Sequence, residues 1–399
     1  MSELLPGDLV GALTRAVAAY EPELVALRRD LHAHPELSRA EVRTTRLVRE
    51  RLKAAGLEPT SLRSGTGLLC DIGSGPGLIA LRADLDALPV VDEKDVPYRS
   101  TVPGICHACG HDVHTAALLG AGLALADLDR AGHLAGRVRL VFQPAEEATP
   151  GGALDVIAAG GLDGVERILT IHCDPRAALG QVGIRAGAIT ASADTLRVRL
   201  RGPGGHTARP HLTADLVYAL GRVVTELPAA LSRRVDPRAA LVLVWGQIAA
   251  GNADNAIPQV GEASGTIRTL DAAAWEAAPD LVRTLVPQIV APYRVQAEVD
   301  YVRAVPPVAN DATSVDLLAA AALSTEGPDS VVPTEQSLGG EDFAWYLEKV
   351  PGALARLGVV GIADGSDHGD LHQGSFDVDE RAIAIGARVL AGAALLAFR

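Results

Sequence analysis

The sequence predicts an α/β protein of two domains, one of which is inserted into the other. The first observation is its length, because 399 residues exceed what one ordinary hydrophobic core accommodates. The second is an alternation of strand-like and helix-like stretches, which is typical of layered α/β folds. The third is a change in that alternation after Gly187. With 48% apolar but only 3% aromatic residues, the core must consist mainly of Ala, Leu, Val and Ile.

Residues 1–188 are expected to form the first part of the main domain. Apolar residues at helical spacing predict two N-terminal helices, over 8–31 and 44–55. Two apolar runs on either side of a glycine-rich turn predict a pair of strands, over 67–72 and 78–83. A long Ala/Leu helix, a strand, a short helix and a further strand are expected next, over 113–128, 137–142, 152–159 and 167–171.

After Gly187 the predicted order is strand, helix, strand, strand, helix, strand. These elements cover 194–200, 213–231, 240–249, 261–270, 272–290 and 295–302. This βαββαβ order is that of the ferredoxin-like sandwich, a self-contained unit of about a hundred residues. Residues 189–302 are therefore predicted to be the inserted domain. Residues 303–399 are predicted to return to the main domain, with helices over 314–322, 343–347 and 381–398.

Charge and hydropathy exclude several classes of partner. The net charge of −13 argues against nucleic acid and anionic membranes, because both require a basic surface. No apolar stretch approaches the length of a membrane span, and residues 1–10 lack the pattern of a signal peptide. We therefore expect a cytoplasmic protein with reduced cysteines that acts on a small molecule.

One stretch is unusually rich in metal-binding side chains: Cys106-His107-Ala108-Cys109-Gly110-His111-Asp112-Val113-His114. Thiolate and imidazole groups are the usual ligands of zinc, and Cys109 and His111 can point the same way in an extended turn. Two other interpretations are a redox dithiol and a fragment of a zinc deaminase. The first does not need the flanking histidines, and the upstream residues match the second only loosely. The stretch thus predicts one half of a metal site.

Three further places could supply the other half, each at the predicted end of a strand or near the C-terminus. Glu146 and Glu147 follow a strand, His172 follows another, and His372 lies near the C-terminus. Taken singly, such carboxylates usually belong to a solvated loop and such histidines are usually structural. Beside a metal, however, one carboxylate can coordinate while its neighbour acts as general base. Enough ligands for two ions are present: Cys109, His111, Glu147, His172 and His372.

A series of motifs runs in order across nearly the whole chain. They are LHAHPELS, LRADLDALP, HACGHDVHTA, FQPAEE, GGHTARPH, NAIP with GTIRT, GGEDFAWYL and LHQGSFDVDE. In these motifs the chain resembles the M20 metallopeptidase family, in particular the aminoacylase/amidohydrolase branch that includes hippurate hydrolases and indole-acetyl-amino-acid hydrolases.

The resemblance implies a di-metal hydrolase in which those five residues are the ligands and Cys109 is shared between the ions. Its catalytic residues would be Glu146 as general base, Asp86, which would orient the metal site, and His206, which would stabilise the oxyanion. In related enzymes the equivalent histidine serves the neighbouring subunit. The inserted domain would be a lid and dimerisation module, giving a homodimer or a higher homo-oligomer. Asn255 and Arg268 would lie near the substrate's carboxylate.

Two positions depart from the family pattern. Asp84 stands where the wider family has a metal-binding histidine, so His111 would have to compensate, and Cys106 stands where this branch often has Met. Thiolate and imidazole ligands favour zinc by default, while manganese, cobalt and nickel stay open.

The predicted activity is hydrolysis of the amide bond of an N-acyl amino acid. Water held by the two metal ions would lose its proton to Glu146, which would then deliver it to the leaving amine. A dipeptidase or carboxypeptidase with the same chemistry is the nearest alternative. A non-catalytic amino-acid or peptide binding protein is disfavoured, because the candidate base and all five candidate ligands are present.

Overall fold

The structure, a computed structural model, describes residues 3–361 and 369–399. The predicted domain ranges 1–188 and 303–399 each include a few residues outside these limits. Within the described residues the chain divides into two compact units. Unit 1 takes the chain up to Gly187, then Ala309–Glu335 and Asp342–Arg399, and unit 2 takes Ala188–Val308 and Gln336–Glu341. Each unit has its own hydrophobic core.

Unit 1 is built on an eight-stranded sheet in the order β1-β2-β4-β3-β5-β16-β6-β15. The strands are β1 (Thr60–Ser61), β2 (Leu68–Ile72), β3 (Leu78–Asp84), β4 (Arg137–Gln143), β5 (Arg167–Ala178), β6 (Val182–Ile184), β15 (Val331–Pro333) and β16 (Gly352–Val360). The central strands β4, β3, β5 and β16 are parallel. Every residue of β3 is buried, as expected for a parallel strand covered on both faces.

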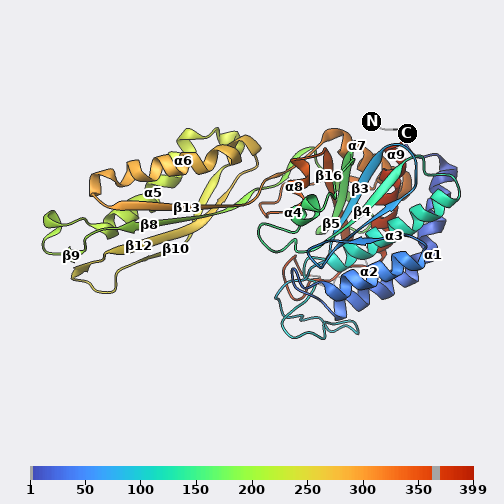
Figure 1. The fold of residues 1–399 in the computed structure, drawn as a ribbon, viewed down its shortest axis with the longest axis horizontal. Helices are drawn as coiled ribbons and strands as arrows, with labels where there is room; N and C mark the ends of the chain where they lie inside the picture. The colour runs from blue at the N-terminus through green and yellow to red at the C-terminus, as the bar shows by residue number, and fades with distance from the viewer. Residues whose placement is uncertain (1–2, 362–368) are drawn as a thin grey trace. The chain divides into compact units, whose positions relative to one another are not determined.

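The helices of unit 1 are α1 (Gly7–Ala33), α2 (Val42–Ala54), α3 (His111–Arg130), α4 (Ala153–Ala158), α7 (Ala312–Glu326), α8 (Ala344–Leu347) and α9 (Arg381–Leu396). Helices α3, α7 and α9 pack on the sheet, and α1 packs on α3 and α9 (Figure 1). Helix α3 is buried along nearly its whole length, which its small and aliphatic side chains permit. This rigid packing fixes the N-terminal end of α3, where the ligand-rich stretch lies.

Two expectations for unit 1 were wrong. Strands β2 and β3 do not pair with each other, because β4 lies between them, antiparallel to β2 and parallel to β3. His172 does not lie at the end of its strand, since β5 continues to Ala178. The local sequence could not have revealed either error. Both depend on pairing with strands that are distant in the sequence: β4 pairs with β2 and β3, and β5 pairs with β3 and β16.

Unit 2 has the element order βαββαβ. Its elements are β8 (Ala193–Arg201), α5 (Leu216–Arg234), β10 (Val242–Ala250), β12 (Val260–Arg268), α6 (Ala272–Val290) and β13 (Gln296–Val305), and its antiparallel sheet has the order β10-β12-β8-β13. Helices α5 and α6 pack together and on the sheet (Figure 1). Short strands β9 (Gly205–His206) and β11 (Ala256–Ile257) form a separate ribbon.

The remaining short elements are β7 (Gly187–Thr190), β14 (Val308–Asn310) and three 3-10 turns, over Pro210–Leu212, Pro237–Ala239 and Ala291–Tyr293. Strands β7 and β14 lie where the chain passes from one unit to the other. No helix among the described residues is both long and apolar enough to cross a membrane.

Candidate metal centre

The centre forms in unit 1 at the N-terminal end of α3. Gly110 caps this helix with a left-handed backbone, φ 84°, so Cys109 lies just before the helix and His111 in its first turn. A Cβ atom at position 110 would lie 2.8 Å from the Cys173 Sγ. Glycine is required here both by the positive φ and by the close approach of β5.

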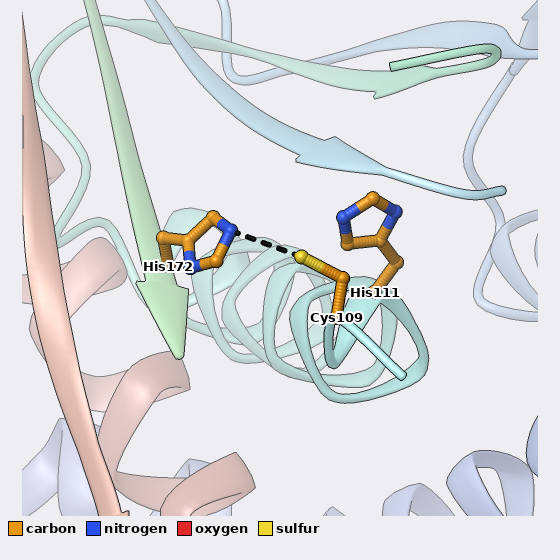
Figure 2. Close-up of side chains that lie close together, drawn as sticks. All are labelled: Cys109, His111 and His172. Atoms are coloured by element: carbon orange, nitrogen blue, oxygen red, sulfur yellow. Dashed lines mark hydrogen bonds between the residues drawn. The ribbon is translucent and has the colours of Figure 1, made fainter. Parts of the chain in front are cut away.

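His172 extends from β5 toward Cys109 (Figure 2), and its Nε2 atom lies 3.5 Å from the Cys109 Sγ. The other ring nitrogen, Nδ1, lies 2.7 Å from the carbonyl oxygen of Cys173. A carbonyl can only accept, so Nδ1 carries the proton and Nε2 presents a lone pair. Burial lowers the pKa of His172 well below its ordinary value, which keeps the ring neutral, as a metal ligand must be.

Glu147 and His372 complete a second group around the same thiol. The His372 Nε2 lies 3.3 Å from the Glu147 Oε1, and its backbone N–H donates to the Ala108 carbonyl at 2.7 Å. Hydrogen bonding to Cys109 and Glu147 raises the pKa of His372 to about 10. In two overlapping groups the donor atoms all lie within 4.8 Å of one another, Cys109 with His111 and His172, and Cys109 with Glu147 and His372.

Glu146 lies beside these groups. Its Oε2 and the Glu147 Oε1 are each 4.0 Å from the His111 Nε2. Within the described chain, neither nitrogen of the buried His111 ring has a hydrogen-bond partner, and such atoms are costly to leave unsatisfied.

The electrostatics of the centre favour positive charge. Although burial opposes charging, Asp84 and Cys109 raise the pKa of His111 well above its ordinary value. Divalent ions would supply that charge, and thiolate, imidazole and carboxylate donors suit zinc and its neighbours. The residues present therefore fit a two-ion centre.

Asp84 and His114 lie against the centre but are engaged elsewhere. The His114 Nδ1 lies 2.7 Å from the Asp84 Oδ1, and its Nε2 accepts from the backbone N–H of Cys173 at 2.8 Å. Both ring nitrogens are thus used, and His114 has no lone pair for a metal. The other Asp84 oxygen, Oδ2, accepts from Arg82 at 2.6 Å. Despite burial, His111, Arg82 and His114 hold the pKa of Asp84 well below its ordinary range.

Asp86 holds the backbone of the carboxylate pair. It accepts the N–H groups of Glu146 at 3.0 Å and of Glu147 at 2.9 Å. Its Oδ2 also accepts from the Ser38 hydroxyl at 2.6 Å, and its Oδ1 lies 3.4 Å from the His111 Nδ1. These contacts suit a residue that orients the centre.

The three predicted substrate-side residues lie in unit 2. His206 in β9 pairs with Ala256 in β11, and the backbone N–H of Thr207 donates to the Asn255 carbonyl at 3.2 Å. Arg268 ends β12 and donates to the Leu338 carbonyl. Strand β12 begins beside the ribbon and runs to Arg268, roughly 26 Å at about 3.3 Å per residue. Within unit 2, His206 and Asn255 therefore lie close together, whereas Arg268 lies far from both.

Sequence reasoning missed two supporting residues, Arg82, which donates to Asp84, and Ser38, which donates to Asp86. Arg82 could have been found, because a charged residue within the otherwise apolar run 78–83 must have a buried partner if that run is a core strand. Cys106 is buried, and burial raises the pKa of its thiol to about 11. Such a thiol is not the reactive thiolate that a redox dithiol requires.

A mixed α/β fold whose Cys, His and Glu donors overlap in two groups is that of a protein with a candidate dinuclear metal centre. Residues 80–396 match the model of peptidase family M20/M25/M40, and the chain belongs to this family.

Several relatives match nearly all of this chain. It is 52% identical to a putative glutamate–cysteine ligase 2-3 of Rhodococcus jostii. The aligned region covers 94% of this chain but only 47% of that protein, so the chain spans about half the length of that relative. It is 39% identical to the N-acetyl-L-cysteine deacetylase of Bacillus subtilis, over 92% of this chain and 86% of the relative. It is 36% identical to thermostable carboxypeptidase 2 of Saccharolobus solfataricus, over 95% and 96%.

A solved structure agrees with these matches. It is that of a dinuclear metal-binding peptidase of the M20 family from Bacillus subtilis, with a TM-score of 0.83 and 34% identity over 96% of this chain and 99% of that one.

Proposed function

We propose that this chain hydrolyses the amide bond of N-acyl amino acids. The observation that carries the proposal is the overlap of the two donor groups at Cys109, with Glu146 beside them. Two divalent ions would be held by Cys109, His111, Glu147, His172 and His372, of which Cys109 belongs to both donor groups. Zinc is the default, and manganese, cobalt or nickel are the alternatives. The name of the N-acetyl-L-cysteine deacetylase supports an acyl amino acid as substrate.

Divalent ions bound there would supply Lewis-acid polarisation of the scissile carbonyl. Glu146 would take a proton from the attacking water and deliver it to the leaving amine, so that the acid and the free amino acid are released. Asp86 contributes by fixing the N–H groups of Glu146 and Glu147, which keeps both carboxylates aimed at the centre.

We further propose that residues 189–302 form a ferredoxin-like lid and dimerisation domain. His206 would stabilise the oxyanion, while Asn255 and Arg268 would lie near the substrate's carboxylate. His206 lies in the ribbon beside the start of β12 and Arg268 lies at the other end of that strand, so one copy of unit 2 cannot bring both to one substrate. If both act on one substrate, they come from two chains. Exposed apolar side chains along the edge strand β10 support self-association: Val242, Val244 and Ile248.

The substitution Glu146→Gln tests the general base. The variant should keep both metal ions, measured by elemental analysis, while turnover of N-acetyl amino acids falls by roughly 10²–10⁴-fold, the usual contribution of a general base. Retained turnover would contradict the assignment.

A carboxypeptidase is the second candidate, because two relatives carry that name. Comparing kcat/KM for N-acetyl and N-benzoyl amino acids with kcat/KM for unblocked dipeptides separates the two. A clear preference for the dipeptides would favour the peptidase.

A further inference from the structure

The turn between α1 and α2 carries part of the LHAHPELS motif, and of its residues only Ser38, which donates to Asp86, has been given a role so far. Glu41, which precedes α2, is completely buried. Its Oε1 accepts two backbone hydrogen bonds, from Arg39 at 2.9 Å and from Ala145 at 2.7 Å. Its Oε2 is buried and, among the residues described, lacks a hydrogen-bond partner. Glu41 therefore works through a single oxygen atom.

Both residues that donate to this oxygen have a strained backbone. Arg39 has φ 67° and Ala145 has φ 53°, in the left-handed region that residues other than glycine rarely adopt. Such conformations persist only where the surroundings hold them, and they concentrate at functional sites. The Glu41 Oε1 supplies that support to both residues at once.

Ala145 immediately precedes the carboxylate pair. Its carbonyl accepts from the N–H of Gly152 at 2.8 Å, so its peptide groups are fixed on both sides. The next two N–H groups go to Asp86, which Ser38 in turn contacts. The turn before α2 thus reaches the carboxylate pair by two routes, directly through Glu41 and indirectly through Ser38 and Asp86.

We propose that Glu41 is a positioning residue for Glu146 and Glu147. By holding Ala145 in its left-handed conformation, it sets the direction in which the following carboxylates leave the backbone. The role of Glu146 as base rests on the function proposed above, whereas the role of Glu147 as ligand can be tested by metal binding alone. Only the Oε1 atom of Glu41 accepts these hydrogen bonds, so the negative charge of the side chain is not required for positioning.

Three substitutions of Glu41 separate the effect of its acceptor oxygen from the effect of its charge. Glu41→Gln keeps the acceptor oxygen and should bind zinc as the wild type does. Glu41→Ala removes the acceptor, and Glu41→Asp withdraws it by one methylene group. Both should weaken zinc binding at one of the two sites by roughly 10–100-fold, the usual effect of losing a group that orients a ligand. Adding Ala145→Gly to Glu41→Ala should restore part of the affinity, because glycine adopts a positive φ without support.

The measurement is calorimetric titration of the metal-free full-length protein with Zn²⁺, followed by kcat and KM of the loaded enzyme. In Glu41→Ala, kcat should fall by a similar factor with little change in KM, because Glu41 contacts no substrate. Should Glu41→Ala fail to fold, Glu41→Asp carries the test.

Asp311→Ala is the matched control. Asp311 also accepts a backbone N–H, that of Ser314 at 2.8 Å, but it caps α7, so its loss should lower stability and leave zinc affinity unchanged. Wild-type zinc affinity in Glu41→Asp, a defect in Glu41→Gln equal to that in Glu41→Ala, or an equal loss in Asp311→Ala would each overturn the proposal. If the wild type hydrolysed no N-acyl amino acid, the proposed function would fail, while zinc affinity would still decide the role of Glu41.

Discussion

Arg82 is a buried cation whose removal should lower the stability of unit 1 markedly. Its guanidinium is 1% exposed and contacts Asp84 at 2.6 Å, Asp342 at 2.9 Å and Gln143 at 2.9 Å. Arg82→Met keeps most of the side-chain volume but takes from Asp84 and Asp342 the guanidinium that both contact. Breaking a buried ion pair in this way costs about 3–5 kcal/mol.

Urea denaturation at fixed metal loading measures this loss. The control is Arg130→Met, because Arg130 pairs with Asp127 on the surface, where the two side chains are 54% and 41% exposed. Such a pair is worth about 0–1 kcal/mol. Adding Asp84→Asn to Arg82→Met should recover part of the loss, since it removes one of the two charges that have lost the guanidinium. A loss in Arg82→Met no larger than in Arg130→Met would refute the reasoning.

Two further predictions concern residues around the centre. Gly110→Ala should destabilise the protein by about 1–2 kcal/mol through its positive φ alone, and the 2.8 Å approach to Cys173 should also weaken zinc binding. Thermal unfolding and zinc titration measure both effects, and unchanged values would contradict the steric argument. Although burial opposes charging, Asp112 and Asp92 raise the pKa of His32 above its ordinary value. The stability lost in His32→Gln should therefore be largest below about pH 6.5, the unfolded pKa, and shrink as pH rises through the folded pKa. Denaturation curves from pH 5 to 9 check this, and a loss that grows with pH would exclude it.

Much of the site could be predicted because its residue types are rare and locally concentrated. Cys109 and His111 lie two positions apart, and Glu146 and Glu147 are adjacent. The long helices were also predictable, since their apolar periodicity is a local property. The family motifs then gave each residue an expected role. The structure brings the donor atoms of the five expected ligands together in two overlapping groups, and their role as ligands stays a prediction.

What the sequence could not decide is how distant segments meet. The passage of β4 between β2 and β3, and the length of β5, depend on strand partners far away in the chain. The exclusion of His114 as a ligand depends on Asp84 and the backbone of Cys173, which occupy both of its nitrogens.

By itself the sequence determined which side chains could bind metal and that two of the carboxylates among the candidate residues, Glu146 and Glu147, are adjacent. Only the tertiary structure decided how those glutamates are held, because the backbone at Ala145 is strained and the oxygen that stabilises it belongs to Glu41, 104 positions away. A buried acceptor can support a left-handed residue only where the fold brings the two together, and no local pattern records that meeting.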